Sequence, residues 1–165
     1  MKSELRKFIR GFRYAGQGIA AALQQERNLR FHVCAAAYVL AFSRFYRFTA
    51  VEYALLAVCI AGVISLELVN SAIERAVDRP DAAHWAAAGA AKDMAAGAVL
   101  VMAISTVIVA VCLFGPRLGV LWAAFTARWP RPVGILLSLL IFSKFIFQSS
   151  NSTQKGEQPN GKTDS

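Results

Sequence analysis

An uncharged stretch near the middle of the chain most constrains its fold. Residues 53–66 read YALLAVCIAGVISL, and the helical pattern continues past Glu67 to about Val77. At about 1.5 Å per residue, a helix over 51–78 is longer than the roughly 30 Å of membrane hydrocarbon. The chain is 56% hydrophobic with a mean hydropathy of +0.45, which favours a small integral membrane protein over a soluble globule.

Two further apolar segments flank this helix. The run FHVCAAAYVLAFS at 31–43 predicts a span over about 29–48, with arginines after it that can extend to the interface. Pro80 breaks the central helix, and a third span is predicted over 86–114. We therefore expect an all-α integral membrane protein with three transmembrane helices.

The amino-terminal region is basic and amphipathic. Apolar residues recur at helical spacing among its charges, which predicts a membrane-surface helix over 4–25 and argues against nucleic-acid binding. A cleaved signal peptide is disfavoured because there is no uninterrupted apolar core or small-residue cleavage site. The positive charge is expected to place this end on the cytoplasmic side of the membrane, facing anionic lipid. Residues 1–30 contain seven basic and two acidic residues. The basic ones are Lys2, Arg6, Lys7, Arg10, Arg13, Arg27 and Arg30, and the acidic ones are Glu4 and Glu26.

The carboxyl-terminal third gives a weaker pattern. Residues 115–148 are expected to form either an interfacial or re-entrant helix or a fourth crossing, and the sequence does not decide between them. Residues 149–165 are polar without periodicity and are expected to be a disordered tail. Three cysteines lie in apolar segments without metal-ligand spacing and are expected to be free thiols: Cys34, Cys59 and Cys112.

Four polar residues follow the apolar part of the central helix at spacings of three, four and four: Glu67, Asn70, Glu74 and Asp78. A helix of 3.6 residues per turn places them on one face. An acid in the apolar zone costs about 2.5–3.5 kcal/mol on insertion scales, so a partner or ligand must offset it. A single such residue would favour helix–helix adhesion. Four on one stripe favour a functional site.

A second charged pair, Lys92 and Asp93, begins the third span on the same side of the membrane. Carboxylates at this edge suit Mg²⁺, which usually shares oxygen ligands with nucleotide phosphates, and Lys92 suits a phosphate contact. The chain has no GxxxxGK[ST] motif and no Gly-rich dinucleotide loop. A soluble-type nucleotide-binding fold is therefore not expected.

The segment ELVNSAIERAVD at 67–78, followed by AKDMAAGAVL at 91–100, resembles the signature of the prokaryotic diacylglycerol kinase and undecaprenol kinase family. QERNLRFH at 25–32 resembles the stretch before the first span, especially in the undecaprenol kinase branch. The resemblance covers about 6–114. It implies a membrane lipid kinase domain over 1–114 that uses ATP to phosphorylate undecaprenol or diacylglycerol, with undecaprenol favoured. It also implies a homotrimer with sites shared between subunits.

The resemblance also implies roles for individual residues. Glu67 would be the general base, and Asn70 would orient the reacting groups. Glu26 and Glu74 would hold the Mg²⁺ that bridges the ATP phosphates. Four further residues would contact ATP: Lys7, Tyr14, Lys92 and Asp93.

Two polar residues have no role in this interpretation, and two alternative functions are considered. His84 is displaced by one position from the family's usual histidine and is left out of the site, and Asp78 has no assigned role. A proton- or cation-coupled transporter subunit would use the same acids as a relay, but its polar groups should extend across the bilayer. In a non-catalytic scaffold the acids would only join helices.

Overall fold

The structure is a computed structural model that describes residues 2–78, 86–126 and 130–147. Within these ranges it is helical and contains no strand, which confirms the predicted all-α class. His84 and the 149–165 tail lie outside the described residues. The elements are α1 (Lys2–Gln25), α2 (Arg27–Ser43), α3 (Ala50–Val77), α4 (Ala86–Phe114), the 3-10 turn η1 (Gly115–Arg117), α5 (Leu118–Thr126) and α6 (Pro130–Phe147).

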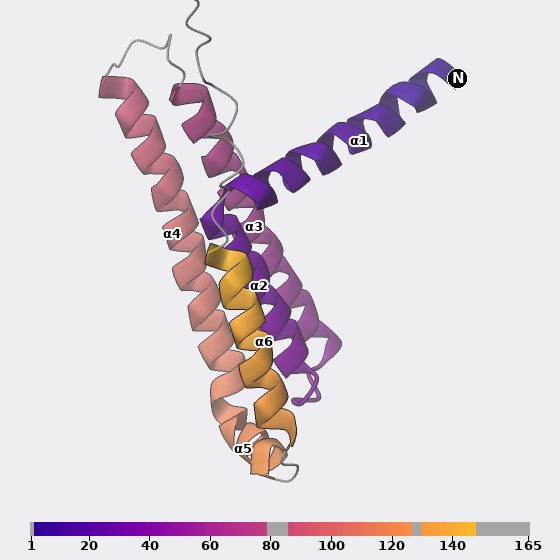
Figure 1. Cartoon of the computed structure of the whole chain (residues 1–165), viewed down its shortest axis with the longest axis vertical. Coiled ribbons are helices and arrows are strands. Elements are labelled where there is room, and N and C mark those ends of the chain that lie inside the picture. Colours follow the sequence, from indigo (N-terminus) through magenta and orange to yellow (C-terminus); the bar gives the residue numbers. More distant parts are fainter. Residues whose placement is uncertain (1, 79–85, 127–129, 148–165) are drawn as a thin grey trace, which may run out of the picture.

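Helices α2, α3, α4 and α6 run side by side, and α1 leaves them at an angle (Figure 1). Helix α3 packs mainly against α4, whereas α2 packs against both α3 and α6. Among the described residues, two segments are long and apolar enough to cross a membrane: Ala50–Val77 and Ala87–Val120. The expected first span is occupied by α2, which ends at Ser43 and is followed by a turn.

The amino-terminal start of α3 is fixed by a capping box. The Thr49 hydroxyl accepts a hydrogen bond from the Glu52 backbone N–H at 3.3 Å, and the Glu52 carboxylate accepts one from the Thr49 N–H at 2.8 Å. From this start the buried residues recur at helical spacing along one face. They are Leu56, Cys59, Val63, Glu67, Asn70 and Ser71. Glu67 and Asn70 therefore lie on the same face of α3 as the apolar residues that pack inside the bundle. The three cysteines of the chain are free thiols in the structure.

The chain bends at Glu26, between α1 and α2. Its backbone is extended, with φ −95° and ψ 114°, and it is the N-cap of α2. The Glu26 N–H still donates to the Ala22 carbonyl at 2.7 Å, while its own carbonyl accepts from the Arg30 N–H at 3.3 Å. The joint is therefore compact, and a single non-helical residue redirects α1 away from the bundle.

Arg30, which is buried, holds this joint together. Its guanidinium donates to the carbonyls of Leu23 at 3.2 Å and Gln24 at 2.9 Å, in the last turn of α1. It also donates to the carbonyl of Ile146, near the end of α6, at 3.2 and 3.4 Å. Carbonyls at a helix carboxyl end lack intrahelical partners, so one cation serves two helix ends.

Helix α6 lies along α2. The Tyr38 hydroxyl and the Ser138 hydroxyl are 3.0 Å apart, and the Tyr38 ring meets the Phe142 ring edge-on at 5.1 Å between centroids. Together with the Arg30 contact, these interactions place α6 within the helix bundle. They also bring its carboxyl end to the α1–α2 joint.

Replacing Arg30 with methionine should destabilise the protein by about 1.5–3 kcal/mol, because carbonyls at the ends of two helices lose a charged donor. Arg30→Lys should recover only part of this loss, since an ammonium lacks the guanidinium fork. The measurement is the unfolding free energy in mixed micelles as sodium dodecyl sulfate is increased. Arg27→Met, at an exposed position on the same helix, is the control and should shift it by less than about 0.5 kcal/mol. Equal effects of both methionine variants would contradict this account of Arg30.

Candidate active site

The candidate site follows the carboxyl-terminal part of α3, from its buried face to its exposed end. Glu67 and Asn70 are buried, with 4% and 7% of their surface exposed. Glu74 is half-buried, and Asp78, the C-cap of α3, is exposed. The four residues therefore form a graded stripe. Its inner members face neighbouring helices, and its outer members can meet a water-soluble ligand.

Asn70 links to the next residue of the stripe, Glu74, by a hydrogen bond. Its side-chain Nδ2 donates a hydrogen bond to Glu74 Oε1 at 3.0 Å. Its Oδ1 is buried and has no hydrogen-bond partner among the residues that the structure describes. Leaving a buried acceptor unpaired costs about 1–3 kcal/mol. An unpaired buried acceptor beside a carboxylate suits a position that a ligand's donor group completes.

Glu67 meets a residue that the sequence analysis did not assign to the site. His32 Nε2, on α2, lies 3.3 Å from Glu67 Oε1. Glu26 and Glu74 also lie close enough to interact electrostatically with Glu67. Three carboxylates and one imidazole therefore gather where α2 and α3 meet. The only sequence signal for His32 was its place in QERNLRFH.

Glu26 reaches this group through an ion pair. Arg75 donates from its Nη2 to Glu26 Oε1 at 2.8 Å, across 49 positions of sequence. The pair joins the α1–α2 joint to α3. Exposed ion pairs contribute about 0–1 kcal/mol, so this contact sets position more than stability.

Asp78, for which the sequence suggests no role, forms an ion pair with Lys92. Lys92 Nζ, on α4, lies 2.9 Å from Asp78 Oδ1 and 2.8 Å from Oδ2. Glu74 and Asp93 also interact electrostatically with Lys92. The predicted Lys-Asp pair on α4 is therefore beside the outer half of the stripe, with Asp78 as the immediate counter-ion of Lys92.

The two predicted ATP contacts on α1 lie apart from this group within one chain. Lys7 pairs with Glu4 at 2.8 Å on an exposed surface. Tyr14 is 57% exposed, and the Arg13 guanidinium lies 5.7 Å from its ring centroid. The amino-terminal half of α1 projects away from the bundle (Figure 1). Their ATP-contacting roles stay predictions.

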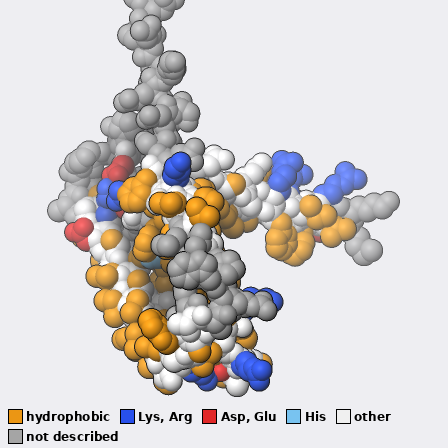
Figure 2. All heavy atoms as spheres, turned by 60° about the horizontal axis from the view of Figure 1, so that its bottom comes forward, with side chains coloured by type: hydrophobic (Ala, Val, Ile, Leu, Met, Phe, Trp, Pro, Cys, Tyr) orange, Lys and Arg blue, Asp and Glu red, His pale blue; other side chains and the backbone are white. Residues whose placement is uncertain are grey.

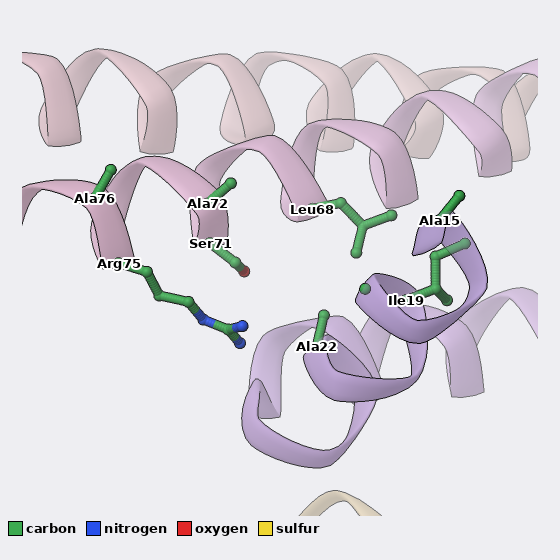
Figure 3. Close-up of a pocket in the computed structure, with 9 residues that line it drawn as sticks. Ala15, Ile19, Ala22, Leu68, Ser71, Ala72, Arg75 and Ala76 are labelled. Carbon is green, nitrogen blue, oxygen red and sulfur yellow. The ribbon is translucent and has the colours of Figure 1, made fainter. Parts of the chain in front are cut away.

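Two grooves flank α3 beside the stripe. The first, of about 590 Å³, lies between α1 and α3, and Figure 3 shows the Arg75 side chain reaching toward it from α3. Its walls are mostly small and apolar: Ala15, Gly18, Ile19, Ala22, Leu68, Ser71, Ala72, Arg75 and Ala76. The second, of about 510 Å³, lies between α3 and α4, and Asn70 is part of its otherwise apolar lining. The stripe thus separates two apolar surfaces.

Comparison with known proteins identifies the family. The chain belongs to the family described as "Prokaryotic diacylglycerol kinase", whose model matches residues 13–114. The match ends where α4 ends, so α5 and α6 lie outside it. An undecaprenol kinase from Bacillus subtilis is 40% identical over 117 residues, which cover 71% of this chain and 95% of that protein. A diacylglycerol kinase from Synechocystis is 40% identical over 108 residues, covering 65% of this chain and 62% of that protein.

Family membership establishes the class of activity. The protein is a membrane lipid kinase, which transfers a phosphoryl group from ATP to a lipid. The expected resemblance and the enzymatic function are therefore confirmed. The comparisons give no support to the transporter alternative, and a kinase is not a non-catalytic scaffold.

Proposed function

We propose that this kinase transfers the γ-phosphoryl group of MgATP to the terminal hydroxyl of a lipid alcohol at the polar stripe of α3. The observation that carries the proposal is the buried pair of Glu67 and Asn70. Glu67 contacts an imidazole, and the Oδ1 of Asn70 has no hydrogen-bond partner within the described part of the chain. A lipid hydroxyl arrives from the apolar side and ATP from water. The stripe leads from one environment to the other.

Glu67 is the proposed general base. It is the most deeply buried acid of the stripe, so it is the member nearest to where a lipid hydroxyl would lie. Its carboxylate would accept the hydroxyl proton as the oxygen attacks the γ-phosphorus. General base catalysis typically contributes about 10²- to 10⁴-fold in rate. Asn70 would orient the reacting groups by accepting a hydrogen bond at Oδ1.

Glu26 and Glu74 are the proposed Mg²⁺ ligands. Each has its Oε1 in a contact with another side chain, while the Oε2 atoms make no hydrogen bond to any residue that the structure describes. No group of three or more His, Cys, Asp or Glu within the described ranges could hold a metal ion. Two carboxylates are nevertheless enough, because protein-bound Mg²⁺ commonly uses one or two and completes its shell with phosphate oxygens and water. Bound there, Mg²⁺ would neutralise charge on the phosphates.

Lys92 would contact an ATP phosphate and exchange its Asp78 partner for phosphate oxygens, with Asp93 contacting the nucleotide beside it. Both carboxylate oxygens of Asp78 lie within 2.9 Å of Lys92, so the ammonium is already held at the exposed edge of the stripe. We also propose a homotrimer with shared sites. In such an assembly Lys7 and Tyr14, which lie apart from the polar stripe of their own chain, could contact ATP bound to a neighbouring subunit.

A multi-pass arrangement in the bacterial plasma membrane is proposed, with α2, α3 and α4 as spans and a cytoplasmic amino terminus. Figure 2 supports a surface position for α1, because basic side chains lie along one edge of the projecting helix and hydrophobic ones along the other. Those hydrophobic residues are exposed: Leu5, Phe8, Ile9 and Phe12. A bilayer surface would cover the apolar edge and leave the charges in water.

Undecaprenol is the proposed acceptor, with diacylglycerol as the alternative. The undecaprenol kinase of Bacillus subtilis matches over 95% of its length, and the QERNLRFH stretch at 25–32 resembles that branch. The apolar groove between α1 and α3 offers a surface for the lipid chain beside the stripe.

The acceptor assignment predicts the products of a direct assay. Purified protein in detergent–lipid micelles should transfer label from γ-labelled ATP to undecaprenol with a higher kcat/KM than to diacylglycerol. The products are identified by chromatography of the lipid extract, with micelles lacking a lipid alcohol as the control. Phosphatidate as the far better product would overturn the proposed acceptor.

Glu67→Gln should abolish turnover because the amide cannot accept the hydroxyl proton, while the protein stays folded in detergent. Initial rates and thermal unfolding curves measure the two properties. Glu52→Gln, the same substitution at the other end of α3, is the control and should keep full activity. Glutamine also satisfies the capping box there. A fully active Glu67→Gln protein would remove Glu67 from the base role.

Glu74→Gln should raise the Mg²⁺ concentration needed for half-maximal rate, because a neutral amide is a weaker ligand for a hard cation. Magnesium titration of the initial rate at fixed total ATP measures this requirement. The titration midpoint for Glu52→Gln should match that of the unaltered protein. An unchanged midpoint for Glu74→Gln would count against Glu74 as a ligand.

A further inference from the structure

Within the described ranges, His32 is the one titratable residue that contacts Glu67 and has no role in the proposed reaction. Its Nε2 lies 3.3 Å from Glu67 Oε1, and the two side chains come from different helices. The imidazole side chain is 21% exposed, whereas that of Glu67 is 5% exposed. Neither residue is part of the proposed Mg²⁺ pair, although Glu26 and Glu74 add negative charge around Glu67.

The surroundings of His32 leave Glu67 as its polar neighbour. His32 lines a cavity of about 80 Å³ whose other walls are apolar apart from Thr106, including Ala35, Val39 and Val63. The Thr106 hydroxyl donates to the Met102 carbonyl at 2.9 Å, within its own helix. The Phe31 ring meets the imidazole edge-on at 5.5 Å. A polar ring on an apolar wall therefore faces a single carboxylate among the described residues.

We propose that His32 is a positioning residue that holds Glu67 in place as the general base. This inference rests on the proposed function, in which Glu67 accepts the hydroxyl proton. In this role the imidazole would donate a hydrogen bond from Nε2 to Oε1, 3.3 Å away, and so fix one oxygen of the carboxylate. Its Oε2 makes no hydrogen bond to the described residues and is left for the lipid hydroxyl.

The physical reason is orientation. A glutamate side chain has three rotatable torsions, and a base that is misplaced by about 1 Å can lose roughly 10²-fold in rate. Tethering one oxygen to a group on α2 restricts the carboxylate to one direction relative to α3. The same division of labour occurs where a buried carboxylate orients a catalytic histidine, with the orienting and reacting groups exchanged.

The test compares two replacements of His32. His32→Leu removes the donor but fits the apolar cavity wall. It should lower kcat by about 10- to 100-fold while leaving the KM values for ATP and lipid alcohol within twofold. His32→Gln keeps an amide donor of similar reach and should recover at least a third of the original kcat. Thr106→Val, which changes the other polar wall of the cavity without touching Glu67, should keep full kcat.

Two results would overturn the inference, and they are distinguishable from failure of the proposed function. If Glu67→Gln is inactive but His32→Leu keeps full kcat, only the positioning role fails. The role also fails if His32→Gln is no more active than His32→Leu while both variants unfold at the same temperature as the unaltered protein. If Glu67→Gln is fully active, the base assignment fails and the positioning role fails with it.

Discussion

The burial of Glu67 on the apolar face of α3 is the constraint on which the rest of the site depends. A carboxylate in that position costs several kcal/mol unless polar groups face it. The structure supplies His32 in contact, with Asn70 buried one turn further along the helix. The buried Oδ1 of Asn70 also has no hydrogen-bond partner among the residues for which the structure gives positions. A substrate bound at this place would supply polar contacts to both buried side chains.

Much of this arrangement follows from helical periodicity alone. The capping box at Thr49 and the apolar spacing from Leu56 onward fix which face of α3 is buried, and Glu67 and Asn70 fall on it. Because α3 ends at Val77 and α4 begins at Ala86, Lys92 and Asp93 lie at the same end of the bundle as the stripe. Such features could be predicted because each depends on residues within one helix or at its ends.

Contacts between distant segments could not be predicted in this way. His32 lies within an apolar run and gave no periodic signal, and its contact with Glu67 depends on how α2 packs against α3. The Asp78–Lys92 pair likewise depends on α3 and α4 being antiparallel neighbours. Glu26 was assigned by family resemblance, since nothing in its spacing relates it to Arg75 across 49 positions. The path of α6 beside α2 was left open by its short apolar length.

The position of Glu26 has a mechanical consequence. It is both the non-helical residue at which α1 turns away and the carboxylate that reaches toward α3. A rotation of α1 about this joint would therefore move the Glu26 carboxylate relative to Glu67, the proposed general base. If α1 adsorbs onto a bilayer as proposed, its angle to the bundle would also set where that carboxylate lies. Arg30, which donates hydrogen bonds to carbonyls at the ends of both α1 and α6, would restrain that rotation.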